Sequence, residues 1–281
     1  MAAKFINNLA TLGCFSILRQ AMIRVLAILL VLLLPRFAQA DLEADQLTMA
    51  GVVEFTNACQ TWDAGRLAKA ADLFRQACTN ASATATNYCW LGTAEFYRAL
   101  QLLGLPENKA NKLAAGAALD RGVVALVQAI KLNGDHAESH ALLGTIYGMK
   151  ISDNVLRAVW LGPRVQHELK LALLTGENNP RVRYLIGTCR FYTAMGSASR
   201  REALAELLTA EKLYAAEAKA PASALESRWG RDSCLTFIGF CYESLGQRDM
   251  AANYFRKALV LHPQDGLALA GLKGTAKNEK K

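Results

Sequence analysis

The sequence has little of what enzymes and β-sheet proteins usually show. Only six of its 281 residues are proline, and no segment alternates apolar and polar residues as a half-buried strand does. It has no glycine-rich phosphate loop after a strand, no Gly-x-Ser-x-Gly motif and no His-Glu-x-x-His motif. Hydrophobic residues make up 52% of the chain, and many of them are alanine, which favours helices. We therefore expect an all-α protein that is not an enzyme and has no cofactor.

Histidine is scarce as well, with four residues in the chain. His136 and His140 are four residues apart on a predicted helix, so both side chains can face the same way, with Glu138 between them. A protein metal site needs at least a third ligand, and two ordinary histidines at the start of a helix explain this pair. The sequence predicts no metal site.

The first 40 residues contain no acidic residue. Arg24 precedes the apolar run 25–34, and Ala38-Gln39-Ala40 follows it. A basic start, a short apolar core and an Ala-x-Ala ending are the parts of a secretory signal peptide. We expect residues 1–40 to be this signal, with Met22 as a second candidate for the start of translation. A membrane anchor is the less favoured alternative, because a spanning helix needs about 20 apolar residues.

Export would make the protein periplasmic or secreted, and it would also remove much of the positive charge. The whole chain carries 32 basic and 24 acidic residues. Four of the basic residues lie in the predicted signal, which leaves 28 against 24. Such a small excess is not typical of a nucleic-acid-binding protein.

One motif near the C-terminus dominates the pattern of the mature chain. Its small and large residues are Gly239, Tyr242, Gly246, Ala251, Phe255, Ala258 and Pro263. These offsets let two antiparallel helices pack closely around a turn, and they resemble the tetratricopeptide repeat, a helix-turn-helix unit of about 34 residues. The same spacing recurs at Ala58, Gly65, Ala70, Phe74 and Ala77.

Further pairs begin at Trp90, Leu143 and Ile186. The resemblance therefore implies a tetratricopeptide-type α-solenoid of about five helical hairpins over residues 41–272, with a partial capping helix at 266–272 and a flexible basic tail at 273–281. The pattern predicts three irregularities: an insertion at 103–115, a helix break or start at Pro163 and a long connection at 217–228. The segment Trp160-Leu161-Gly162-Pro163, together with Asn179-Pro180-Arg181 and Trp229-Gly230, resembles a group of exported bacterial tetratricopeptide proteins.

In this family the first helix of each pair lines a concave groove that holds peptides or partner helices. The corresponding residues here are mainly aromatic residues and threonines. They are Phe55, Trp62, Phe96, Tyr97, Thr145, Tyr184, Thr188, Phe191, Tyr192 and Phe240. Aromatic side chains anchor apolar peptides well, so the resemblance implies a non-catalytic scaffold that binds an envelope protein or peptide. The alternative is that some of these rings pack against neighbouring helices.

A second candidate surface is basic. It comprises Arg157, Arg164, Lys170, Arg181, Arg183 and Arg190. Such a group can bind an anionic small molecule or glycan, and the alternative is a solvated face whose charges are offset by nearby acids.

Six cysteines remain after residue 40. In an exported protein they permit disulfides, and Cys78 and Cys89 form the most plausible pair because they lie late in one helix and early in the next. The alternative is that the cysteines pack between helices as small apolar residues. The sequence leaves the oligomeric state open.

Overall fold

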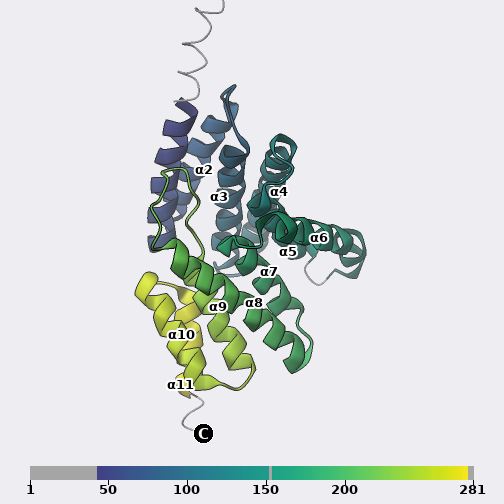
Figure 1. Ribbon diagram of the computed structural model, residues 1–281, viewed down its shortest axis with the longest axis vertical. Helices are drawn as coiled ribbons and strands as arrows, with labels where there is room; N and C mark the ends of the chain where they lie inside the picture. The colour runs from purple at the N-terminus through teal and green to yellow at the C-terminus, as the bar shows by residue number, and fades with distance from the viewer. Residues whose placement is uncertain (1–42, 152–153, 278–281) are drawn as a thin grey trace, which may run out of the picture.

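The chain folds into a stack of helical hairpins. The computed structural model describes residues 43–151 and 154–277, and these contain helices and no strand (Figure 1). The described part of α1 covers 43–61. The other helices are α2 (Ala64–Thr79), α3 (Ala85–Leu103), α4 (Lys109–Leu132), α5 (Ala137–Ile151), α6 (Val155–Gly176), α7 (Pro180–Thr193), α8 (Gly196–Glu217), α9 (Arg231–Ser244), α10 (Arg248–Leu261) and α11 (Gly266–Lys277). The all-α prediction is confirmed.

Neighbouring helices pair as the repeat pattern predicts. Helices α3 and α4, α5 and α6, α7 and α8, and α9 and α10 pack against each other, and α11 covers the last pair. In that pair a Cβ atom on Gly239 would lie 2.5 Å from the ring of Phe255, so only glycine allows the two helices this close. Gly246 has a φ of +77° in the turn between them, a conformation that glycine adopts without steric cost.

Two of the expected irregularities are wrong in detail. Helix α4 begins at Lys109, where the side chain of Asn108 caps it by accepting from the backbone N–H of Asn111. The connection after α3 is therefore only 104–108 rather than 103–115. Pro163 lies inside α6 instead of breaking it. The turn before it is exposed at Val159, so water can hydrate the carbonyl group that loses its hydrogen bond.

The expected long connection lies between α8 and α9, and we call residues 218–230 the strap. In Figure 1 the strap is the green loop that runs beside the first helices. The indole Nε1 of Trp90 donates to the carbonyl oxygen of Leu225 at 3.0 Å, and the hydroxyl of Ser227 donates to Glu138 at 2.5 Å. The strap thus joins the C-terminal half of the chain to α3 and α5.

Two predictions concern the ends of the chain. Helix α11 continues to Lys277, so the first residues of the expected tail are helical. The predicted signal peptide lies outside the described residues.

By length and composition, α4 is the one helix in the described part that could cross a membrane. It packs against α3 and α5 and buries Leu119 and Leu126.

Candidate functional site

The predicted groove residues divide into a buried set and an open set. The buried residues are Phe55, Phe96, Tyr97, Tyr184 and Thr188. The exposed or half-buried residues are Trp62, Thr145, Phe191, Tyr192 and Phe240. The structure therefore does not present the ten side chains as one continuous surface.

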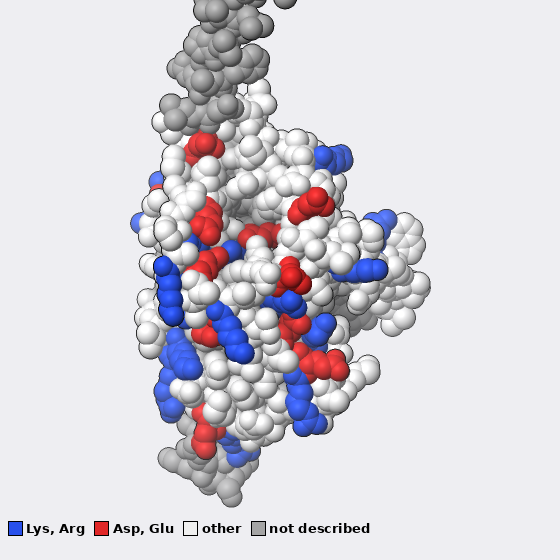
Figure 2. All heavy atoms as spheres, viewed as in Figure 1, with Lys and Arg blue, Asp and Glu red and all other residues white. Residues whose placement is uncertain are grey.

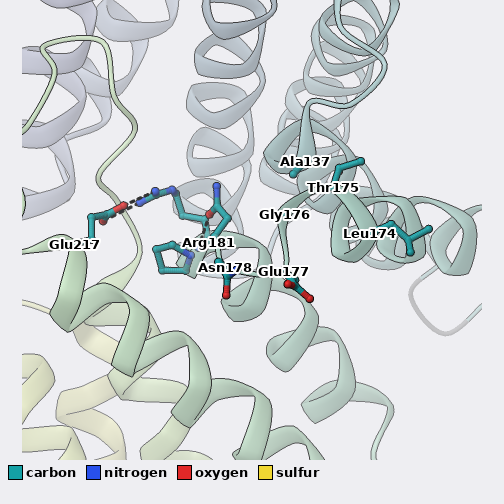
Figure 3. A pocket seen from close by; sticks show the side chains of 10 residues that line it. Ala137, Leu174, Thr175, Gly176, Glu177, Asn178, Arg181 and Glu217 are labelled. Atoms are coloured by element: carbon teal, nitrogen blue, oxygen red, sulfur yellow. Dashed lines mark hydrogen bonds and ion pairs between the residues drawn. The ribbon is translucent and has the colours of Figure 1, made fainter.

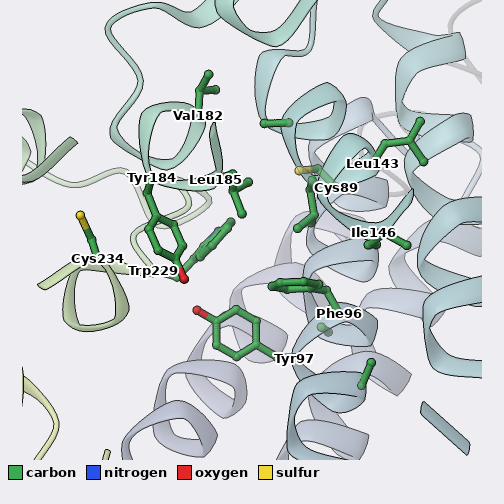
Figure 4. Close-up of a cluster of buried hydrophobic side chains, with 14 of the residues drawn as sticks. Cys89, Phe96, Tyr97, Leu143, Ile146, Val182, Tyr184, Leu185, Trp229 and Cys234 are labelled. Carbon is green, nitrogen blue, oxygen red and sulfur yellow. The ribbon is translucent and has the colours of Figure 1, made fainter. Parts of the chain in front are cut away.

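Two residues of the buried set, Tyr97 and Tyr184, are covered by Trp229 of the strap. The ring of Trp229 lies 5.8 Å from that of Tyr97 and 6.4 Å from that of Tyr184, in edge-to-face contacts (Figure 4). Tyr97 also packs against Phe55 at 4.9 Å. Burial raises the pKa of both tyrosines well above the ordinary value. The rings of the buried set form core contacts, which is the alternative that the sequence left open.

The first and last hairpins meet across the same face. The ring of Trp62 lies 6.5 Å from that of His262, and Nδ1 of His262 lies 3.3 Å from a carboxylate oxygen of Asp232. Hydrogen bonding to Asp232 raises the pKa of His262 despite its burial. Trp62 has a φ of +53°, which costs free energy in a residue with a side chain. These contacts join the turn after α1 to the end of α10 and the start of α9.

The open set centres on α7 and α9. Phe191 contacts Tyr192 at 5.5 Å, Phe237 at 5.7 Å and Phe240 at 6.3 Å between ring centroids. We call these four residues the α7–α9 aromatic cluster. Tyr192 is 74% exposed. Phe237 is not among the predicted groove residues, although its spacing of three residues from Phe240 places both on one side of a helix.

The predicted basic group does not form a patch of free cations. Arg181 is buried, and its guanidinium donates to Glu138 at 2.7 Å and to Glu217 at 2.5 Å. Arg183 and Arg190 both pair with Glu206. Of the others, Arg157 donates to the carbonyl oxygen of Lys150 at 3.4 Å, Arg164 lies over the ring of Trp160, and Lys170 is exposed. Figure 2 shows basic and acidic side chains interspersed on one face.

A buried polar network surrounds Arg181. Glu138 accepts hydrogen bonds from Asn179, Arg181 and Ser227. Burial raises the pKa of Glu138, but the charge of Arg181 and these hydrogen bonds outweigh burial and leave the pKa below its ordinary value of 4.5. The network ties α5, α7 and α8 to the strap.

An open pocket of about 510 Å³ lies beside this network, lined by residues that include Thr175, Glu177, Arg181 and Glu217 (Figure 3). The only cationic side chain in its lining is already bound to the carboxylate of Glu217. The pocket therefore offers an anion no free positive charge.

Among the described residues, neither the cysteines nor His140 form the disulfide or metal site that their sequence positions could suggest. All six cysteines are free thiols, so the expected bridge between Cys78 and Cys89 is not formed. Burial raises the pKa of each of these two thiols to about 12, which leaves them unreactive at neutral pH. The ring nitrogens of His140 lie 2.6 Å from Glu168 and 2.8 Å from the carbonyl oxygen of Gly134. The described residues contain no group of three metal-ligating side chains.

Comparison with known proteins identifies the fold. No protein-family model matches the sequence, and no curated protein matches it. Among solved structures, TTC0263, a thermophilic tetratricopeptide protein of Thermus thermophilus, aligns with a TM-score of 0.56 and 16% identity over 83% of this chain and 98% of that chain. The HusA haemophore of Porphyromonas gingivalis aligns with a TM-score of 0.55 and 20% identity, over 69% and 92% of the respective chains. The predicted tetratricopeptide solenoid is thus confirmed as the fold.

Proposed function

We propose that the protein is a non-catalytic scaffold that binds an envelope protein or peptide at the open part of its concave face. The observation that carries the proposal is the α7–α9 aromatic cluster. It lies on the first helices of two successive hairpins, and its Tyr192 is largely exposed. Repeat solenoids use their concave surfaces for binding.

The chemistry of the cluster suits an apolar segment of a partner. Aromatic rings bury a large area with few rotatable bonds, so they bind with little loss of conformational entropy. Phe191 and Phe240 are half-buried and already fixed by ring contacts with Phe237. Met195 at the adjacent turn is also exposed, and its flexible thioether side chain adapts to different partners.

The periplasmic location is part of this proposal and rests on the sequence pattern of residues 24–40. Export followed by cleavage would produce a mature chain that begins at Asp41. N-terminal sequencing of the protein from fractionated cells tests this directly. A chain that retains residues 25–34 in the membrane fraction would contradict it.

Site-specific crosslinking tests the binding surface. A photoreactive phenylalanine derivative replaces Tyr192 in one version of the protein and Val260 in another. Val260 is the control, because it is exposed on α10, the second helix of its hairpin. We expect a discrete crosslinked envelope protein from position 192 only. Met195→Asp should weaken this crosslink, whereas the matched change Leu267→Asp at an exposed position of α11 should not. Equal crosslinks from positions 192 and 260, or none from position 192, would contradict the proposal.

A further inference from the structure

The first half of α6 exposes a group of large apolar side chains. Val155, Leu156, Val159 and Trp160 are between 68% and 81% exposed. Their spacing of one, four and five residues places them on one side of the helix. We call these four residues the α6 apolar face.

The fold does not need this face. Helix α6 packs against α5 through its second half, where Leu169 lies against Gly144 and Ala172 is buried. Its first turns extend past this contact, and Figure 1 shows α6 projecting from the side of the stack. The exposed side chains therefore contribute little to folding, and exposed apolar groups that gather in this way indicate a surface for binding.

The charges around the α6 apolar face restrict what can cover it. Residues 154–167 include Arg157 and Arg164 and no acidic residue, and the next acid along the helix, Glu168, is paired with His140. The guanidinium of Arg164 lies over the ring of Trp160, 5.1 Å from its centroid. A covering surface should therefore combine apolar groups with negative charge.

A second copy of the chain does not meet this condition. In a two-fold contact the same patch of both copies meets, and a patch with two arginines and no acidic residue offers its own copy no negative charge. A convex, projecting helix that combines tryptophan, aliphatic residues and arginine instead matches the helices that lie in the boundary layer of a lipid bilayer. Anionic lipid headgroups supply the missing negative charge.

We propose that the first half of α6 binds the surface of an anionic phospholipid membrane, with the α6 apolar face inserted among the lipids. The two arginines would lie at the level of the headgroups. This contact would hold the solenoid at a membrane while the α7–α9 aromatic cluster, which lies on other helices, stays free. The proposal does not depend on the proposed function of that cluster.

Vesicle flotation tests the proposal. The full chain is produced, and wild type and variants are purified in the same processed form. Vesicles contain either phosphatidylcholine alone or equal parts of phosphatidylglycerol and phosphatidylcholine. We expect wild type to float with the anionic vesicles, and the double variant Leu156→Asp/Trp160→Asp to bind them at least about tenfold more weakly. The control is Leu174→Asp, because Leu174 is 70% exposed on the same helix outside the face, and it should bind like wild type.

Two further measurements assign the contact. Arg157→Gln/Arg164→Gln should weaken binding to anionic vesicles by about fivefold for each arginine removed. Brominated lipids should quench the tryptophan fluorescence of wild type more than that of Trp160→Phe. The difference between the two proteins measures the quenching of Trp160 separately from any contact made by the N-terminal segment. All substituted side chains are exposed, so thermal unfolding should be unchanged.

Three results would overturn the proposal. The first is that wild type fails to float with anionic vesicles. The second is that the double variant floats as well as wild type, or that Trp160 is not quenched. The third is that light scattering finds a dimer that Leu156→Asp/Trp160→Asp converts to a monomer, which would show that a second copy covers the face.

Discussion

Replacing Trp229 with alanine tests whether the strap is a structural part of the solenoid. Trp229 is 6% exposed and packs edge-to-face against two tyrosines. A buried tryptophan covers about 200 Å², which at about 25 cal/mol per Å² gives an upper estimate of ~5 kcal/mol. Large-to-small changes of buried aromatic residues cost about 3–5 kcal/mol. We therefore expect Trp229→Ala to lower the free energy of unfolding by this amount.

Trp160→Ala is the matched control, because it removes the same side chain from an exposed position and should change stability by less than about 0.5 kcal/mol. The assay is urea unfolding followed by circular dichroism, since fluorescence changes with every tryptophan removed. A loss of about 3–5 kcal/mol should also lower the melting temperature by roughly 6–20 °C in a domain of this size. If the free energies of unfolding of the two variants lie within about 1 kcal/mol of each other, the strap is not packed as described.

Three other predictions concern stability. Arg181→Met should cost about 3–5 kcal/mol, measured by urea unfolding, because it leaves the buried carboxylate of Glu138 and the half-buried carboxylate of Glu217 without their counter-charge. Gly148→Ala should stabilise the protein by about 0.5–1 kcal/mol because a methyl group there meets nothing within 4 Å, whereas Gly92→Ala should destabilise it by about 1–3 kcal/mol through a clash at 2.6 Å. The pKa of His262 is raised in the folded protein, so its stabilising contribution is complete below 6.5 and is lost as pH rises through the folded-state value. Unfolding across this range should show a pH dependence in wild type that His262→Gln lacks.

The hairpins could be predicted from sequence because their determinants are local. Gly239 and Phe255 contact each other over 16 residues of chain, and the turn at Gly246 lies between them. Each repeat carries these positions at nearly constant spacing. A pattern of small and large residues therefore determines which two helices pair and how closely they approach.

The site could be predicted only in part, because its geometry depends on contacts between hairpins that are far apart in the sequence. Trp229 contacts Tyr97 because the hairpins between them bring the strap back to α3. No local sequence pattern predicts a contact of this range. Arg181 belongs to a basic group in the sequence, yet its partners Glu138 and Glu217 come from helices 43 residues before and 36 residues after it. Because of such long-range contacts, residues that were expected on the surface lie in the core.

The same packing limits where a partner can bind. A partner that occupied the site of Tyr97 and Tyr184 in the buried set would first have to displace Trp229. If that displacement costs about 3–5 kcal/mol, as estimated for the loss of its packing, the apparent affinity would fall by roughly a factor of a hundred to several thousand. The α7–α9 aromatic cluster carries no such penalty, because Tyr192 is exposed without any movement of the strap. A variant such as Trp229→Ala should therefore leave binding at this cluster unchanged while it lowers stability, whereas a partner that needs the buried set should bind the variant more tightly.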